Sequence, residues 1–142
     1  MPGSVSTLKK NFPARYESLV EIARFIHPCC QNACLDSNSC YHVESAVDEA
    51  CSNIIEHAYA GEENGNIEIS CQDNPADITI TIVDHGKNFN PENILDPDTN
   101  ASLEDRESHG LGLFFIRKLM DQVEFSRAAD NSNILTLVKF KK

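Results

Sequence analysis

The amino-acid sequence predicts an α+β fold, a two-layer sandwich in which three helices cover one face of a mixed, mostly antiparallel sheet of four to five strands. Apolar residues recur at helical spacing before residue 60, which predicts helices in the first part of the chain. Directly afterwards, near 67–69 and 78–83, they alternate with polar residues as in half-buried strands. A long polar segment then precedes another helical stretch and two more strand-like stretches, so helices and strands are expected to form separate layers.

Composition limits what this chain can do. Its 142 residues, 41% hydrophobic, suit a single domain over 1–142. With 22 acidic and 12 basic residues the formal charge is -10, which repels phosphate backbones, so no direct nucleic-acid binding is expected. The sequence contains no signal-peptide pattern and no membrane-spanning apolar run, so we expect a cytoplasmic protein without membrane contact. The six cysteines are then expected to be reduced and to pack on helix faces.

The first part of the chain predicts a short edge strand at residues 4–8 and two helices. The first helix is expected from about Pro13, which suits a first helical turn, to the low thirties. The stretch LDSNS, residues 35–39, contains turn and capping residues. It predicts the start of a second helix that continues to about Tyr59.

The second part predicts a hairpin, a loop, a helix and two further strands. Alternating isoleucines on both sides of Asn74-Pro75 predict a turn between two strands. Residues 85–109 are polar and have no sustained periodicity; connections this long are usually functional when they occur in compact domains. A third helix is expected from about Leu111 to Asp121, and strands are expected near 123–128 and 134–140.

Three polar side chains fall on one stripe of the predicted second helix. Glu49, Asn53 and His57 are spaced four residues apart and border the apolar face. In a half-buried cleft, the carboxylate of Glu49 can accept a proton and the amide oxygen of Asn53 can bind a hard cation. An ordinary polar flank of the helix explains the same pattern, so both interpretations remain open at this point.

Asp84 stands where the second strand of the predicted hairpin ends, and Gly86 follows two residues later. A carboxylate beside a flexible glycine can approach a flat ligand and accept a hydrogen bond from an exocyclic amine such as that of adenine. Asp-x-Gly is also common turn chemistry. By itself this motif does not decide between the two.

The segment Ser108-His109-Gly110-Leu111-Gly112-Leu113 directly precedes the third predicted helix. Glycines at a helix start let backbone N–H groups approach a phosphate, which the helix dipole also attracts. Neither of the common nucleotide signatures is present, since the chain has no GxxxxGK[ST] and no strand directly before the glycines. A plain helix entry is the alternative.

The order of the three motifs is more specific than any one of them. Together they resemble the gyrase, chaperone, histidine kinase and mismatch-repair ATPase superfamily, and in particular the bacterial anti-sigma factor serine/threonine-protein kinases. The resemblance covers about residues 6–140. DEACSNIIEHAY (48–59) is similar to the N box of that family, VDHGKNF (83–89) to its first glycine box, and SHGLGLFFIRKLMDQVEF (108–125) to its second.

This resemblance implies a Bergerat-type ATP-binding fold with ATP and Mg²⁺ as cofactors. It implies that Glu49 is the general base, that Asn53 holds the metal ion and that His57 belongs to the same cleft. Asp84 would recognise adenine, with Gly86 giving it room. The triphosphate would lie along the backbone of residues 110–113, under a lid formed by about 87–109; these four residues are Gly110, Leu111, Gly112 and Leu113.

The sequence departs from the family in one place. Some members carry an arginine just before the lid glycines, where it suits the terminal phosphate, whereas this chain has Ser108-His109 there and Arg106 a little upstream. The contact to the terminal phosphate is therefore open. His85 and His109 are expected to be loop residues and not ligands.

The function that the resemblance implies is an ATP-dependent protein-serine kinase and anti-sigma regulatory factor. It would transfer the γ-phosphoryl group to a serine of a STAS-type anti-sigma-antagonist protein in a partner-switching system, and would also hold a sigma factor. A homodimer is implied by the same resemblance. The alternative is a non-catalytic ATP- or ADP-binding regulatory module that sequesters a protein partner. The catalytic half of a two-component histidine kinase is less favoured, because residues 1–40 are too short to include a dimerisation segment with an acceptor histidine.

Overall fold

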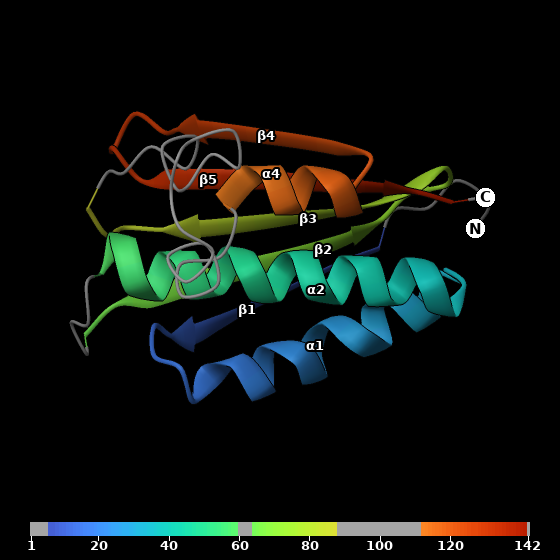
Figure 1. Cartoon of the computed structure of the whole chain (residues 1–142), viewed down its shortest axis with the longest axis horizontal. Helices are drawn as coiled ribbons and strands as arrows, with labels where there is room; N and C mark the ends of the chain where they lie inside the picture. The colour runs from blue at the N-terminus through green and yellow to red at the C-terminus, as the bar shows by residue number, and fades with distance from the viewer. Residues whose placement is uncertain (1–5, 60–63, 88–111, 142) are drawn as a thin grey trace, which may run out of the picture.

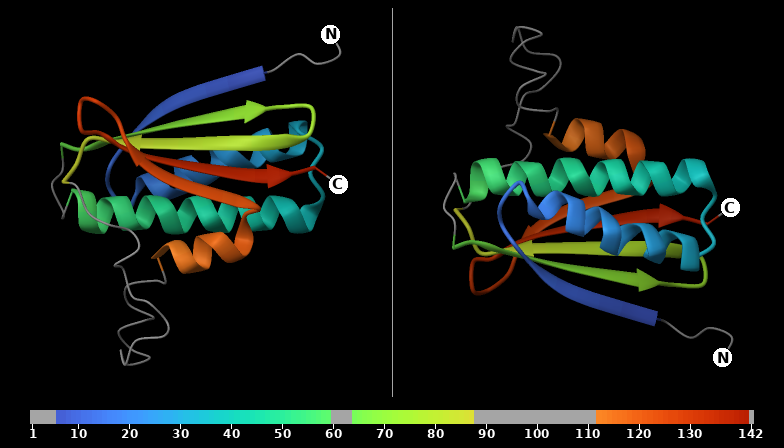
Figure 2. Two further views of the ribbon diagram at one scale, coloured as in Figure 1. Left: turned by 90° about the horizontal axis from the view of Figure 1, so that it is seen from above. Right: turned by 90° about the horizontal axis from the view of Figure 1, so that it is seen from below.

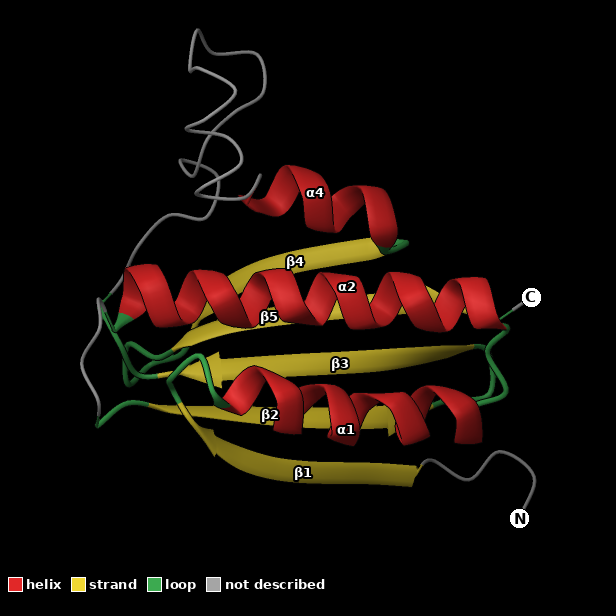
Figure 3. Ribbon diagram, turned by 60° about the horizontal axis from the view of Figure 1, so that its bottom comes forward, coloured by secondary structure: helices red, strands yellow, loops and turns green. Residues whose placement is uncertain are grey.

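The computed structural model describes residues 6–59, 64–87 and 112–141, which form a helical layer on a five-stranded sheet (Figure 1). Along the chain the elements are β1 (Ser6–Pro13), α1 (Ser18–Asn32), α2 (Ser37–Asn53), a π-helical turn η1 (Ile54–Ala58), β2 (Asn66–Asp73), β3 (Asp77–Asp84), α4 (Gly112–Leu119), β4 (Gln122–Arg127) and β5 (Asn133–Phe140). The helices α1, α2 and α4 lie on one face of the sheet (Figure 3). The predicted α+β class is confirmed.

The strand order is β1-β2-β3-β5-β4, and every neighbouring pair among these strands is antiparallel. The expected mixed sheet is therefore antiparallel throughout the described strands. The reason lies in the position of β5. The strands β3 and β4, on either side of α4 in the sequence, run in the same direction, but β5 lies between them and pairs with both.

The two faces of the sheet differ in burial because side chains alternate along a strand. In β3, Ile78, Ile80 and Ile82 are at most 1% exposed and face the helices, while Thr79 and Thr81 lie on the open face. Figure 2 shows the strands in front of the helices in one view and behind them in the other. The hairpin between β2 and β3 turns at Asn74, whose N–H donates to the carbonyl of Asp77 at 2.9 Å, as predicted.

The first strand and the first helix differ from the prediction. Pro13 does not begin a helix; it is the last residue of β1, where it pairs with Asn66. Phe12, which is only 2% exposed, pairs with Ile67, so β1 continues to the next residue, Pro13. Proline is tolerated there because β1 is an edge strand and no further strand requires the N–H that proline lacks. The helix α1 therefore starts at Ser18, and β1 extends from Ser6 well beyond the predicted residue 8.

The second and third helices agree with the prediction. At the start of α2 the carboxylate of Asp36 accepts a hydrogen bond from the Ser39 N–H at 2.7 Å, an N-cap of the kind worth about 1 kcal/mol. Beyond Asn53, η1 extends the helical path to Ala58, one residue short of the predicted end. All six cysteines are free thiols, and all but Cys34 are buried; Cys71, however, is buried on the strand β2 and not on a helix face. In the part of the chain that the structure describes, no helix combines the length and the hydropathy needed to span a bilayer.

Candidate functional site

The end of α2 carries a buried amide. Asn53 is 5% exposed, and it follows Ala46 and Ala50 on the buried face of the helix, at spacings of seven and three residues. Sequence spacing placed Asn53 at the border of this face; packing places it within the buried set. A buried amide needs hydrogen-bonding or metal partners, so this position is costly unless Asn53 has a polar neighbour or ligand.

A wide helical turn follows Asn53 and joins α2 to the end of β3. In η1 the N–H of Tyr59 donates to the carbonyl of Ile54 at 3.1 Å, a spacing of five residues. Turns of this kind are rare and frequently occur at functional sites. The hydroxyl of Tyr59 then accepts a hydrogen bond from the N–H of His85 at 2.9 Å and donates to the carbonyl of Asn66 at 2.6 Å. These bonds hold the ends of α2 and β3 together.

Gly86 is required at this junction for a reason the sequence did not reveal. A Cβ atom at Gly86 would lie 2.6 Å from the carbonyl oxygen of Ala58, closer than any side chain can approach. The same carbonyl accepts a hydrogen bond from the N–H of Lys87 at 2.6 Å. The glycine therefore lets the chain pass against the end of η1, whereas the sequence analysis assigned the space to a ligand.

Asp84 is a buried carboxylate held by two donors. Its exposed fraction is 2%, and its Oδ1 accepts hydrogen bonds from the N–H of Gly86 at 3.0 Å and from Nδ2 of Asn133 at 2.9 Å. Burial raises the pKa of Asp84 above its ordinary value, while these two hydrogen bonds, and to a smaller extent His85, act in the opposite direction. Both hydrogen bonds end on Oδ1, so Oδ2 is the oxygen that a ligand beside Asp84 would meet.

Asp84 and Asn53 line one pocket between the helical layer and the sheet. The space now open there is about 20 Å³, enough for about one water molecule, so a larger ligand requires its apolar side chains to shift. Its walls combine three polar side chains with an apolar majority, as in most small-molecule sites. The lining residues are Ala50, Asn53, Ile54, Ile82, Asp84, Leu113, Ile116, Phe125, Asn133 and Leu135.

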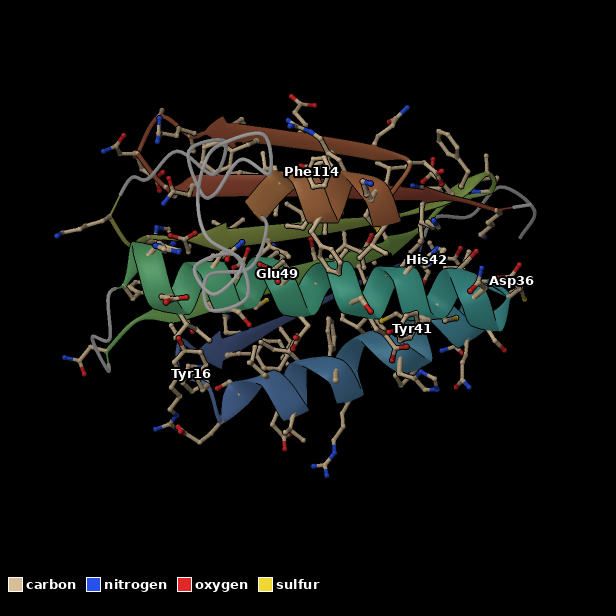
Figure 4. The ribbon with its side chains drawn as sticks, viewed as in Figure 1. Tyr16, Asp36, Tyr41, His42, Glu49 and Phe114 are labelled. Carbon is tan, nitrogen blue, oxygen red and sulfur yellow. The ribbon has the colours of Figure 1, made fainter. Side chains whose placement is uncertain are left out.

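Glu49 lies one helical turn before Asn53 and is half-buried, but it is not among the residues that line this pocket. Figure 4 shows Glu49 midway along α2, with Phe114 on the neighbouring α4. Burial raises the pKa of Glu49, and the charge of Asp48 raises it further, whereas a hydrogen bond from the Asn53 side chain lowers it. The amide of Asn53 thus influences the pKa of Glu49 from the next turn of the helix, and of the two side chains only Asn53 lines the pocket.

Of the other predicted site residues, one lines the pocket, others lie away from its lining, and the rest fall outside the described residues. Leu113, 2% exposed, lines the pocket from α4, and Gly112 is the first residue of that helix. His57 lies half-buried on η1, with its Nε2 4.0 Å from the Glu56 carboxylate, and is not among the lining residues. Gly110 and Leu111 lie outside the described residues, as does the predicted lid apart from Lys87.

Asn133 lines the pocket although no sequence pattern pointed to it. It is the first residue of β5 and pairs with Asp84, the last residue of β3, across 49 residues of sequence. Nothing near Asn133 in the sequence distinguishes it from the turn residues Asn131 and Ser132 that precede it. Only the pairing of β3 with β5 brings its amide to the carboxylate, so a correct strand register was the one signal able to identify it.

The donor set fits an adenine nucleotide and a divalent cation. A buried carboxylate that lines a largely apolar pocket, and whose described hydrogen bonds both end on Oδ1, suits an exocyclic amine on a flat ring. The amide of Asn53 offers an oxygen of the kind that hard cations bind, one helical turn from a carboxylate.

Comparison with known proteins shows which family the chain belongs to. Residues 12–139 match the family model described as histidine kinase-like ATPase domain. The chain is 33% identical over 102 residues to the serine-protein kinase RsbW of Halalkalibacterium halodurans, an alignment that covers 69% of this chain and 60% of that protein. It is 32% identical over 98 residues to the anti-sigma F factor of Clostridium beijerinckii, covering 68% of each.

A solved structure shows the same fold at lower identity. The crystal structure of the RsbU and RsbW domains of Rv1364c from Mycobacterium tuberculosis matches with a TM-score of 0.67 and 15% identity, covering 96% of this chain and 33% of that one. Because the family model spans most of the chain and two relatives share 33% and 32% of the aligned residues, the chain belongs to the histidine kinase-like ATPase domain family and, within it, to the anti-sigma factor serine kinases.

Proposed function

We propose that this protein is an ATP-dependent protein-serine kinase and anti-sigma regulatory factor that transfers the γ-phosphoryl group of ATP to a serine of a STAS-type antagonist protein. The names of the relatives support a kinase and an anti-sigma role. One observation in the molecule carries the proposal: Asn53 and Asp84 line the same pocket, and Glu49 is coupled to Asn53 one turn away.

In this proposal the chain positions the reactants. ATP and Mg²⁺, when bound, would supply the phosphoryl group and the neutralisation of its charge. Asp84 would accept a hydrogen bond from the adenine amine, and Asn53 would hold the metal ion through its amide oxygen. The backbone of 110–113 would contact the phosphates under a lid of about 87–109, within a single domain over 1–142. His57 would support the cleft from η1.

Glu49 would accept the proton of the acceptor serine as the general base. Its pKa is raised by burial and by Asp48, which brings a carboxylate closer to the basicity that proton transfer at neutral pH requires. Glu49 is partly exposed and lies one helical turn from Asn53, which lines the pocket, and this suits a base that must reach a hydroxyl arriving from another protein.

The oligomeric state, the compartment and the protein partners are proposed from the same family. We propose a homodimer in the cytoplasm that alternates between the STAS-type antagonist and a sigma factor according to nucleotide state. The charge of -10 disfavours direct binding to nucleic acid, so the regulatory partners in this proposal are proteins.

The decisive experiment uses the purified protein with γ-labelled ATP, Mg²⁺ and a STAS-type antagonist. We expect label on an antagonist serine, and we expect Glu49→Gln to reduce the transfer rate by about 10² to 10⁴ while ATP affinity stays near the wild-type value. Glu44→Gln, the same change five residues earlier on α2, is the control and should transfer normally. ATP binding without any label on the antagonist would instead support a regulatory module that binds nucleotide and sequesters a partner without catalysis.

A further inference from the structure

We infer that Asn133 is a positioning residue that makes the pocket selective for 6-aminopurine nucleotides over 6-oxopurine nucleotides. The inference rests on the proposed nucleotide binding and adds a selectivity and the residue that sets it. Its basis is the hydrogen-bonded chain that extends from Arg127 through Asn133 to Asp84 along the pocket wall.

The first step is the position of the amide. Asp84 and Asn133 are register partners at one end of the β3–β5 pair, and each is 2% exposed. The Nδ2 of Asn133 donates to Oδ1 of Asp84 at 2.9 Å and to the carbonyl of Lys87 at 3.3 Å. The second donor to Oδ1 is the N–H of Gly86 at 3.0 Å. Within the described residues both donors reach the same oxygen, and they hold the carboxylate from the end of β3 and from the start of β5.

The side-chain amide of Asn133 is oriented with its NH₂ group toward Asp84. An asparagine side chain can donate or accept, and only its surroundings decide which end faces a neighbour. Here Nε of Arg127 donates to Oδ1 of Asn133 at 3.4 Å, which commits that oxygen to the arginine and leaves the NH₂ group for Asp84. Arg127 therefore fixes Asn133 as a donor toward the carboxylate.

The amide donor of Asn133 favours the ionised form of Asp84, and this determines which purine substituent the carboxylate can bind. A carboxylate that accepts two hydrogen bonds is favoured in its ionised form, and an ionised carboxylate can only accept. A 6-amino group donates to it, whereas a 6-oxo group presents a second acceptor and is repelled. Burial alone raises the pKa of Asp84, and the Asn133 hydrogen bond is the largest influence that lowers it. Without that bond a protonated Asp84, which can donate to a 6-oxo group, becomes more populated.

Few other charged groups act on this carboxylate in the described residues. His85 lies next to it and favours its ionised form, Cys51 on α2 is a buried thiol beside it, and Arg127 acts through the amide of Asn133. Asn133 is accordingly the side chain whose replacement should change selectivity most while leaving the pocket walls in place.

A matched pair of variants tests this. Threonine and valine have nearly the same shape and both suit a strand, but only threonine can donate a hydrogen bond. ATP and inosine triphosphate differ at one edge of the purine: the 6-amino group is replaced by a 6-oxo group, and N1 changes from an acceptor to an N–H donor. The ratio of their dissociation constants therefore measures how the site distinguishes this edge of the ring. Titration calorimetry with each nucleotide and Mg²⁺, repeated over a pH series, gives this ratio independently of any transfer activity.

We expect the wild-type protein to prefer ATP over inosine triphosphate by at least about tenfold at neutral pH. Asn133→Val should weaken ATP binding by about 10- to 100-fold, the range for a lost hydrogen bond to a charged group, with little change for inosine triphosphate. Asn133→Thr should recover most of the preference. The loss of preference on acidification should begin at higher pH in Asn133→Val than in the wild-type protein. Ser132→Ala, a change at a buried neighbour with no bond to Asp84, should leave the ratio unchanged.

Several results would overturn the inference. Equal binding of the two nucleotides by the wild-type protein would do so, as would a wild-type ratio and pH profile in a folded Asn133→Val variant. If both Asn133 variants fail to fold, Arg127→Met, a change at an exposed residue, must lower the ratio in the same direction; an unchanged ratio there rejects the inference. Absence of ATP binding to the wild-type protein is a different result, because it removes the proposed function itself.

Discussion

The two ends of the β3–β5 pair each bury one charged side chain on the helix-facing side of the sheet. At one end Asp84, 2% exposed, is held by the donors Gly86 and Asn133; at the other Lys139, 7% exposed, is held by acceptors. The ammonium of Lys139 donates to the carbonyl of Leu119 at 2.6 Å and lies 3.2 Å from Nδ1 of His42. Both charges are thus held by uncharged groups deep in the fold.

The two charged side chains differ in whether they lie beside a space that a ligand can enter. Lys139 caps the last carbonyl of α4, a position where a cation is favoured by the helix dipole, and its role is complete without a ligand. Asp84 lines a pocket, and among the described residues the hydrogen bonds that it accepts both end on Oδ1. A buried charge therefore indicates function only when its unused hydrogen-bonding capacity faces a space that a ligand can enter.

The largest expected effects come from substitutions of Asp84 and Lys139, which should change different properties: ATP affinity at one end of the β3–β5 pair and stability at the other. Asp84→Asn keeps an oxygen for Asn133 and Gly86 but removes the charge, so we expect ATP affinity to fall by about 10- to 100-fold with little loss of stability. Lys139→Met should do the opposite, lowering the free energy of unfolding by about 1 to 3 kcal/mol because the Leu119 carbonyl loses its partner, with ATP affinity unchanged. Calorimetric titration and urea unfolding measure the two quantities. Loss of ATP binding in Lys139→Met would abolish the distinction.

An intermediate effect concerns pH. Burial raises the pKa values of Asp84 and Glu49, so between the unfolded value near 4 and the raised folded value the folded protein binds more protons than the unfolded chain. The contribution of these groups to stability is therefore greatest at low pH and is lost as the pH rises through the folded pKa. Urea unfolding of the nucleotide-free protein over a pH series measures this, and Asp84→Asn should flatten the profile. Parallel profiles for variant and wild type would contradict the assignment.

The smallest effect tests the end of α2 that lies away from the pocket. Asp36 caps this helix through the Ser39 N–H at 2.7 Å, so Asp36→Ala should destabilise the protein by about 1 kcal/mol. ATP affinity should not change, because the cap is at the opposite end of α2 from Asn53 (Figure 4). Asn38→Ala, an exposed neighbour in the same turn, should leave the melting temperature near that of the wild type. A clear loss of ATP binding in Asp36→Ala would show that the two ends are coupled.

Much of the fold could be predicted from the sequence, because the type of each helix or strand depends on local hydrophobic periodicity. Alternation in Ile78, Ile80 and Ile82 predicted a half-buried strand, and the turn at Asn74 is where the sequence placed it. Pro13 misled the prediction, since proline suits a first helical turn as well as a sheet edge, and only the pairing of Pro13 with Asn66 decides between them.

The candidate site was accessible only in part. Spacing on one helix grouped Glu49 with Asn53, and both are coupled in the structure. It could not show that Asn53 enters the pocket while Glu49 stays at its edge, because neighbouring turns of a helix differ in burial only once other elements pack on them. Gly86 was predicted to give a ligand room beside Asp84, and that role stays a prediction; the backbone of Ala58 explains why no side chain fits at this position.

The sequence by itself determined the class of the fold, the β2–β3 hairpin and the helix that carries Glu49 and Asn53, because hydrophobic periodicity and capping act over a few residues. Tertiary structure alone decided that Asn133 meets Asp84, that Tyr59 joins η1 to β3, and that Lys139 is structural. These outcomes depend on strand order and register, which bring together groups far apart in the chain and which no local pattern encodes.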